Sequence, residues 1–165
     1  CARRLRQVGV LHADTSGAGG TSWVGVETLR AEGDARRLGE ALWQWGTPTA
    51  ASVHYCVEAG MTTIATGGVV SGLDVARALA LGAQAAGIAR PVYQAFCEGG
   101  REGALRYLMH VEAELRAVML LTGCRNVAAL HTLEPVITGE LRDYVRPGVT
   151  LRAPSVRAAA SEVSA

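Results

Sequence analysis

The chain has 165 residues, of which 49% are hydrophobic and 19% are charged, and its formal net charge is +1. This length suits one domain with a hydrophobic core, and the apolar content excludes a disordered chain. The near-neutral balance gives no reason to expect nucleic acid or a membrane surface as a partner, and no apolar run approaches the ~20 residues of a membrane span.

The four cysteines, Cys1, Cys56, Cys97 and Cys124, lie far apart and form no C-x-x-C pair, so the sequence does not predict a zinc site. We expect them to be buried, reduced thiols in a cytoplasmic protein rather than disulfides. The segment from Cys1 to Leu5 looks like the end of a helix. We therefore expect the chain to be the carboxyl-terminal part of a longer protein.

Three short apolar segments predict buried β-strands, namely Val8–Ala13, Thr62–Ala65 and Ala83–Ile88. Each is followed by a stretch with helical spacing of apolar residues. Strands that alternate with helices pair in parallel through right-handed crossovers, so the sequence predicts an α/β fold. A complete (β/α)8 barrel takes about 250 residues and eight strands, so three such units cannot close one.

Capping and breaking residues predict where the helices begin and end. Ser22 is expected to cap one helix and Asn126 another, and Thr47 and Pro48 are expected to be the N-cap and first residue of a third. A break is expected at Gly99–Gly100. The helices predicted in this way cover Arg36–Trp45, Ala50–Ala59, Gly72–Leu81, Glu102–Thr122 and Val127–Leu130.

Glycine-rich segments follow the first two predicted strands, at Ser16–Trp23 and Thr66–Val69, and the third strand ends at Ala89–Pro91. Glycine lets the backbone approach an anion closely, and main-chain N–H groups at a helix N-terminus can hold a phosphate. In a (β/α)8 barrel, the loops after the last two strands form the usual phosphate site. The sequence therefore predicts the phosphate-holding part of a cofactor enzyme.

The segments Asp14–Trp23 and Trp45–Ser52 closely resemble signatures of the type 2 isopentenyl-diphosphate isomerases, which are FMN-dependent (β/α)8 barrels. The Gly67–Gly68 pair followed by Gly72–Ala76 is shared by many FMN barrels, including α-hydroxy-acid oxidases and IMP dehydrogenase. The Gly-Gly-Thr-Ser-Trp run with the later Trp-Gly-x-Pro-Thr element is typical of a much narrower group of proteins, and it indicates the isomerase family. Further similarity lies in Ala65–Val69, Gly72–Ala83, Gly87–Pro91 and Leu115–Leu130.

This resemblance implies that the chain holds the sixth, seventh and eighth strands of the barrel and its terminal helices. Residues 1–150 would be the carboxyl-terminal part of an FMN-binding TIM barrel, and residues 151–165 a disordered tail. Ser16 and Thr21 would contact FMN. Gly67, Gly68 and Val69 would bind the flavin phosphate through main-chain N–H groups, and Ala89 and Arg90 would complete the phosphate cradle. The implied cofactor-binding residues are Ser16, Thr21, Gly67, Gly68, Val69, Ala89 and Arg90.

The resemblance also implies which parts of the site this chain lacks. Val70 stands where many relatives have Arg, which removes one cationic contact to the phosphate. The family's flavin-contacting Lys and its Gln-Glu pair for diphosphate and magnesium belong upstream of Cys1, and this chain has no Lys. No catalytic or metal-binding residue is therefore assigned to this chain.

The activity implied is the reversible interconversion of isopentenyl and dimethylallyl diphosphate in isoprenoid biosynthesis. Reduced FMN, NADPH and Mg²⁺ are the implied cofactors, and a small-molecule diphosphate is the substrate. A cytoplasmic homo-oligomer of the full-length protein is expected, with no nucleic-acid or membrane partner. The isolated chain is expected to be incomplete and inactive, because it would supply only the flavin-phosphate-binding part.

Two other interpretations stay open. The chain could come from another FMN barrel, such as an α-hydroxy-acid oxidase or dehydrogenase, although these need a base, typically His, after the seventh strand. The corresponding loop, Thr66–Val70, contains no His. The chain could also be a truncated, inactive reading frame that binds nothing.

Overall fold

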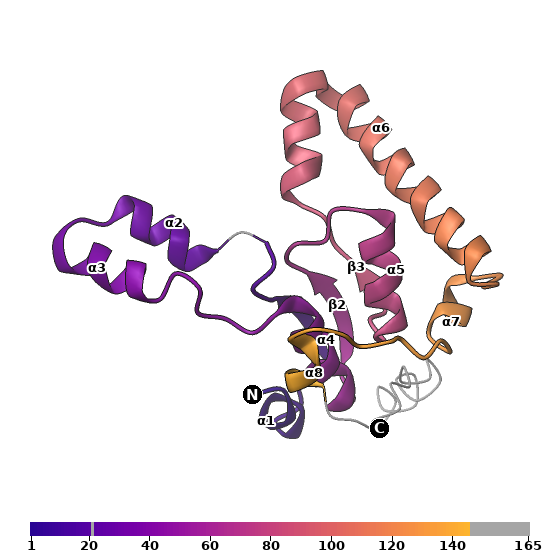
Figure 1. Cartoon of the computed structure of the whole chain (residues 1–165), viewed down its shortest axis with the longest axis horizontal. Helices are drawn as coiled ribbons and strands as arrows, with labels where there is room; N and C mark the ends of the chain where they lie inside the picture. The colour runs from indigo at the N-terminus through magenta and orange to yellow at the C-terminus, as the bar shows by residue number, and fades with distance from the viewer. Residues whose placement is uncertain (21, 146–165) are drawn as a thin grey trace.

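The computed structural model of the chain describes residues 1–20 and 22–145, which form three parallel strands and the helices that connect them (Figure 1). The strands are β1 (His12–Ser16), β2 (Thr62–Thr66) and β3 (Ala85–Ala86), in that spatial order. Both strand pairs are parallel. The predicted parallel α/β topology is therefore confirmed in the described part of the chain.

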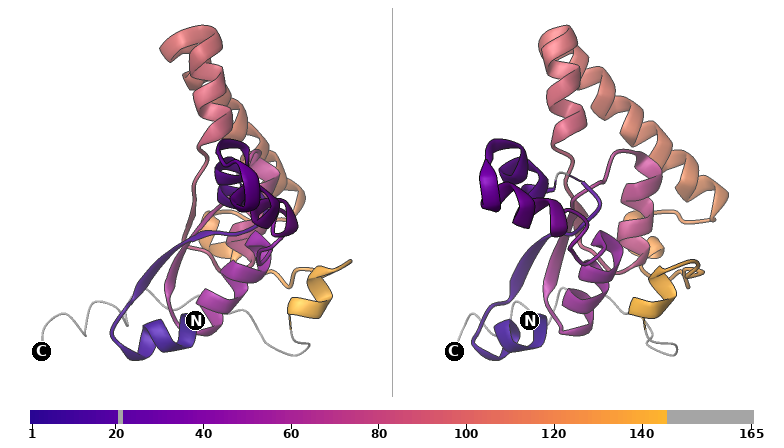
Figure 2. Two further views of the ribbon diagram at one scale, coloured as in Figure 1. Left: turned by 90° about the vertical axis from the view of Figure 1, so that its left-hand side faces the viewer. Right: turned by 60° about the vertical axis from the view of Figure 1, so that its left-hand side comes forward.

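The helices differ in how they relate to the sheet. Helices α4 and α5 pack on it, whereas α2 and α3 pack against each other in an arm that extends away from it in Figure 1 and in the right-hand view of Figure 2. The described helices are α1 (Ala2–Gln7), α2 (Trp23–Arg30), α3 (Gly33–Ala41), α4 (Thr49–Glu58), α5 (Gly72–Ala80), α6 (Arg90–Leu121), α7 (Val127–Leu130) and α8 (Leu141–Tyr144).

The predicted boundaries of the first and third strands are wrong. Val8 is the C-cap of α1, and Gly9, with φ of +94°, turns the chain before β1 begins at His12. The apolar residues after α1 thus form a turn rather than a strand. Only Ala85 and Ala86 of the third predicted strand lie in register with β2, between the hydrogen bonds that the N–H groups of Gln84 and Gly87 donate to β2 carbonyls at 2.8 and 2.9 Å. Ala83 is buried in the core before this pairing starts.

Three predicted helix starts agree with the structure. Ser22 Oγ accepts from the Gly25 N–H at 3.0 Å, and Asn126 Oδ1 accepts from the Ala129 N–H at 2.9 Å. The helix predicted to begin at Gly72 does so, with Ser71 as its N-cap. These caps satisfy N–H groups that have no partner within the helix.

Other predicted boundaries need correction. Helix α4 begins at Thr49 with Pro48 as N-cap, because the carbonyl of Thr47 accepts instead from the Ala18 N–H at 2.7 Å. Helix α3 begins at Gly33 and ends at Ala41, earlier than predicted, and α8 was not predicted. The expected tail, residues 151–165, lies outside the described residues.

The predicted glycine break divides α6 into two helical segments. Gly99 and Gly100 have non-helical backbone angles, and Gly100 has φ of +58°, which glycine adopts without steric cost. The segment before the break leads away from β3, and the segment after it returns alongside α5 (Figure 1). The helix expected from Glu102 is thus the second segment of a helical hairpin.

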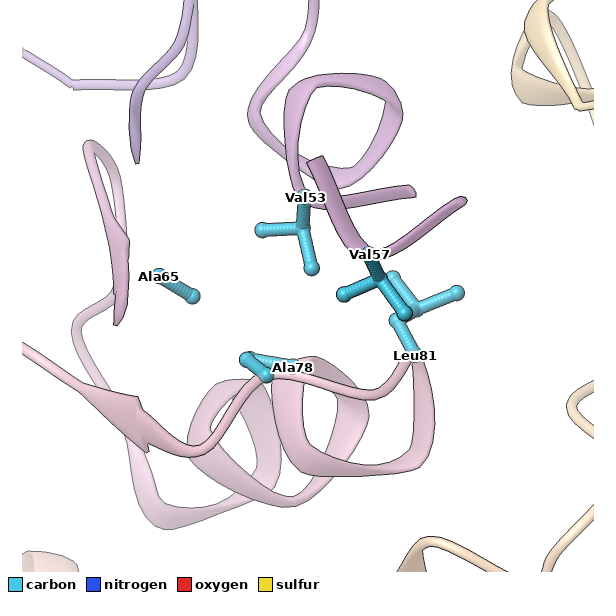
Figure 3. Packing of buried hydrophobic residues seen from close by; sticks show 6 residues of the cluster. Val53, Val57, Ala65, Ala78 and Leu81 are labelled. Carbon is cyan, nitrogen blue, oxygen red and sulfur yellow. The ribbon is translucent and has the colours of Figure 1, made fainter. Parts of the chain in front are cut away.

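The core lies between the sheet and helices α4 and α5. Val53 and Val57 of α4 meet Ala65 of β2 and Ala78 and Leu81 near α5 (Figure 3). Small alanines on the strand and on α5 allow this close approach. Burial of these side chains removes apolar area from water and provides the main stabilising contribution of this layer.

The opposite face of the sheet is open in the described structure. Asp14 and Ser16 of β1 are exposed, and Ile64 of β2 is 41% exposed. Side chains alternate between the two faces of a strand, and the intervening Thr15, Thr63 and Ala65 are buried. The described helices therefore cover only one face of this sheet.

The cysteines are all free, as expected, but they are not all buried. Cys124 is buried and Cys56 half-buried, whereas Cys1 and Cys97 are exposed. Partial burial raises the pKa of the Cys56 thiol, and the positive charge of the chain's amino terminus opposes this to a lesser extent.

Among the described helices, none combines the length and apolar character needed to cross a membrane.

His54 is expected to make folding sensitive to acid. Its side chain is 1% exposed, its Nδ1 has no hydrogen-bond partner among residues 1–20 and 22–145, and burial lowers its pKa from 6.5 despite the opposing charge of Glu58. The unfolded chain therefore binds a proton more readily, so the free energy of unfolding should fall as the pH drops below about 6.5. Urea denaturation between pH 7.5 and 5 should show this slope. A His54→Leu variant with an equal slope would contradict the assignment.

Candidate functional site

Two glycine-rich loops interlock at the carboxyl edge of the sheet. Ser16 pairs with Thr66 in the strand register, so the loops that follow β1 and β2 start side by side. Thr49 Oγ1 at the start of α4 donates to the carbonyl of Gly67 at 2.6 Å. The Ala18 N–H donates to the carbonyl of Thr47 just before α4 at 2.7 Å, so three chain segments meet here.

Glycine is required in these loops because the backbone of each loop fills the space that a side chain of the other loop would need. Gly67 and Gly68 have φ of +86° and +82°, which disfavour any residue with a Cβ. A Cβ at Gly68 would overlap the carbonyl oxygen of Gly19. A Cβ at Gly20 would lie 2.5 Å from the Gly68 nitrogen and would cover that amide.

The amides of the β2–α5 loop divide into occupied and available groups. The Val70 N–H donates to Asp74 Oδ2 at 3.3 Å, the Gly72 N–H donates to Glu114 Oε2 at 2.6 Å, and the Asp74 N–H donates to Ser71 Oγ at 3.1 Å. The amides of Gly68 and Val69 make no hydrogen bond to any described residue. Because main-chain donors need a partner, these two amides fit an anionic group such as a phosphate.

The second segment of α6 holds the same loop from outside. The Tyr107 hydroxyl donates to the carbonyl of Val70, and Glu114 accepts from Gly72. Partial burial raises the pKa of Tyr107, and the carboxylates of Glu114 and Asp74 add to this, so the hydroxyl keeps its proton at neutral pH. The loop is thus bonded on both sides of Ser71.

A side chain of β2 connects all three strand ends. Thr66 Oγ1 lies 2.6 Å from Asp14 Oδ1 and 2.7 Å from the carbonyl of Thr15, and its single hydroxyl proton can be donated to either acceptor on β1. Its methyl group faces the loop after β3, where a Cβ at Gly87 would lie 2.6 Å from Thr66 Cγ2. The loop after β3 can approach Thr66 this closely because position 87 is glycine.

The structure describes six of the seven predicted site residues, and these six follow or end strands at one edge of the sheet. Ser16 ends β1, Gly67 to Val69 follow β2, and Ala89 is the N-cap of α6, of which Arg90 is the first residue. Ser16 and the Gly67–Val69 segment come together through the interlocked loops. Within the described residues, no hydrogen bond joins Ala89 or Arg90 to either loop. Thr21 lies outside the described residues.

Sequence reasoning did not assign three residues that support this site, Thr49, Tyr107 and Glu114. Thr49 belongs to the Trp-Gly-x-Pro-Thr element, which indicates the family but does not by itself indicate a contact between Thr49 and the glycine loops. Tyr107 and Glu114 lie on a predicted amphipathic helix without any local signal of a distant partner. In the part of the chain that the structure describes, no three His, Cys, Asp or Glu side chains group as metal ligands.

A parallel sheet with helices between its strands defines an α/β protein, and its interlocked glycine loops carry amides that are available to an anionic group. The sequence model of the FMN-dependent dehydrogenase family matches residues 47–134. This match covers more than half of the chain, so the protein belongs to the FMN-dependent dehydrogenase family.

Among characterised relatives, the chain is similar to isopentenyl-diphosphate delta-isomerases of archaea. It is 42% identical to the Methanosarcina mazei protein over 145 residues, which cover 86% of this chain and 39% of that protein. It is 40% identical to the Thermococcus onnurineus protein over 152 residues, which cover 90% of this chain and 40% of that protein. The chain thus spans about two fifths of the length of these relatives.

Solved structures of FMN-dependent oxidases share the fold. A mandelate oxidase with 3,3-difluoro-2-hydroxy-3-phenylpropionic acid is 29% identical, with a TM-score of 0.52 over 78% of this chain and 40% of that chain. A mandelate oxidase variant with a monooxide FMN adduct is similar to the same degree, with 78% of this chain and 42% of that chain covered. FMN is therefore the cofactor that the family and its solved members support.

Proposed function

We propose that this chain supplies the flavin-phosphate-binding part of an FMN-dependent isopentenyl-diphosphate isomerase. The observation that carries the proposal is the pair of interlocked glycine loops, in which the Gly68 and Val69 amides donate to none of the described residues. The identity of 40–43% to named isomerases over most of the chain supports this reaction over others.

In this proposal, each predicted residue has a role at the cofactor. The amides of Gly67, Gly68 and Val69 would hold the phosphate of FMN, and Ala89 and Arg90 would add the N-terminus of α6 and a cationic side chain. Ser16 and Thr21 would contact the flavin through their hydroxyl groups. No residue of this chain is assigned to proton transfer or to metal binding.

The rest of the site would come from the part of the relatives that this chain does not match. The open sheet face with Asp14 and Ile64, and the free edges of β1 and β3, would then be completed by the other strands of a (β/α)8 barrel. Residues 1–150 would form the last three strand–helix units and the terminal helices. The isolated chain would bind at most the flavin and would not catalyse the reaction.

FMN would supply the acid–base chemistry that interconverts isopentenyl and dimethylallyl diphosphate, and the protein would orient it. NADPH would keep the flavin reduced, and Mg²⁺ would neutralise the diphosphate of the substrate. A cytoplasmic homo-oligomer of the full-length protein, without nucleic-acid or membrane partners, completes the proposal.

A 2-hydroxy-acid oxidase is the second candidate, because mandelate oxidases are among the solved neighbours. The loop after β2, from Thr66 to Val70, carries no His that could act as a base for such a substrate. This difference favours the isomerase.

Complementation tests the proposal. The chain would be co-expressed with the amino-terminal part of the Methanosarcina mazei isomerase that it does not match, and the purified assembly would be supplied with FMN, NADPH and Mg²⁺. We expect conversion of isopentenyl diphosphate to dimethylallyl diphosphate, and none from either part alone. FMN uptake without isomerisation would count against the isomerase, and flavin reduction by mandelate would support the oxidase.

A further inference from the structure

The side chain of Thr49 lies between the two glycine loops. Its hydroxyl donates to the carbonyl of Gly67 at 2.6 Å, and the residue stands at the first position of α4. A Cβ at Gly19 would lie 2.9 Å from Thr49 Oγ1, and a Cβ at Gly17 would overlap the Thr49 backbone. Both loops therefore pack on this one residue.

The bond from Thr49 also determines the direction of the neighbouring amide. The Gly67 carbonyl and the Gly68 N–H belong to one planar trans peptide, in which they point in opposite directions. When the hydroxyl holds the carbonyl toward α4, the Gly68 N–H must point away from α4. That amide makes no bond to a described residue, and a side chain at position 20 would collide with it, because a Cβ there would lie 2.5 Å from the Gly68 nitrogen.

Gly68 needs such a constraint because glycine is the most flexible residue. Gly67 and Gly68 have φ values of +86° and +82°, but glycine without further contacts adopts many other backbone angles. A loop that had to become ordered on binding would lose affinity through conformational entropy. The hydroxyl of Thr49 orders this peptide before a ligand arrives.

We propose that Thr49 is a positioning residue that orients the Gly67–Gly68 peptide so that the Gly68 amide faces the phosphate of the flavin. This inference rests on the proposed function, because it takes the anion at this amide to be the FMN phosphate. Thr49 does not touch the flavin, and its effect is transmitted through the peptide plane.

Two variants of Thr49 distinguish the effect of the hydroxyl donor from the effect of the side chain's shape. Thr49→Val keeps the shape and removes the donor, whereas Thr49→Ser keeps the donor. Thr63→Val is a matched control, because Thr63 is fully buried in β2 and its hydroxyl donates to the Met61 carbonyl at 3.0 Å, away from the loops. All three would be made in the complemented assembly with the amino-terminal part of the Methanosarcina mazei isomerase.

Dissociation constants for FMN and for riboflavin, which lacks the phosphate, would be measured by flavin fluorescence. We expect Thr49→Val to weaken FMN binding about tenfold, the usual effect of one lost hydrogen bond, and to leave riboflavin binding unchanged. Thr49→Ser should bind FMN within about threefold of the unmodified protein. Thr63→Val should lower stability without a selective loss of FMN.

The outcomes distinguish this inference from the proposed function. If the unmodified assembly binds FMN no better than riboflavin, the phosphate site itself is wrong and Thr49 loses its role with it. If the unmodified assembly prefers FMN and Thr49→Val keeps that preference, the phosphate site stands and the role of Thr49 is overturned. An equal loss of FMN and riboflavin would show a purely structural role for Thr49.

Discussion

Replacing Gly68 with alanine is expected to remove most of the FMN affinity of the complemented protein. The new Cβ would occupy the left-handed region at φ of +82°, and it would overlap the carbonyl oxygen of Gly19. The first effect costs about 1–2 kcal/mol and the second about 1–3 kcal/mol. A combined cost of about 3 kcal/mol corresponds to a loss of FMN affinity on the order of 100-fold, measurable by flavin fluorescence titration.

Gly123→Ala is the control for backbone strain. Gly123 has φ of +71°, nothing lies within 4 Å of a Cβ built there, and it ends α6 far along the chain from the loops. This variant should lower the free energy of unfolding by about 1–2 kcal/mol and leave FMN binding unchanged. If Gly68→Ala bound FMN as well as Gly123→Ala does, the loops could not be the phosphate site.

Replacing Gly72 with alanine is expected to separate α5 from α6. Gly72 is buried, and a Cβ there would overlap the carbonyl oxygen of Val111 and the nitrogen of Leu115, both in the backbone of α6. Backbone atoms cannot rotate away as a flexible side chain can. We expect the free energy of unfolding in urea to fall by about 3 kcal/mol. The FMN affinity should fall as well, because Tyr107 and Glu114 would no longer hold the loop.

Gly99→Ala is the matched control for this change. Gly99 has a φ of −134°, and a Cβ there would meet only the flexible end of Arg106, at 3.2 Å from Nη2. This variant should stay within about 0.5 kcal/mol of the unmodified chain. Equal stability of Gly72→Ala and Gly99→Ala would show that α5 and α6 do not pack as described.

Several features of the fold follow from local sequence. The alternation of apolar segments with helical ones predicts parallel strands, and the structure confirms this for β1, β2 and β3. Ser22 and Asn126 cap helices as predicted, because the hydroxyl or amide bonds N–H groups only three residues away. The cofactor roles of Ser16 and of Gly67 to Val69 remain predictions.

The strand boundaries were less predictable for a physical reason. Apolar residues also occur at exposed helix ends and at buried helix–strand junctions, where they look the same in sequence as those of a strand. Val8 is apolar and yet is 78% exposed at the C-cap of α1, and Ala83 is buried before β3 begins. Only pairing with a neighbouring strand defines where a strand starts, and the pairing partner lies about 50 residues away in sequence, as with Ser16 and Thr66.

The sequence by itself determined the α/β class, the positions of the glycine loops and the family resemblance, because each depends on residues that are close together in the chain. The tertiary structure alone decided that the two loops interlock, that Thr49 holds the Gly67 carbonyl and that Glu114 occupies the Gly72 amide. These contacts join segments that are 18 and 42 residues apart. Their geometry follows from how the helices pack on the sheet, which no local pattern of residues specifies.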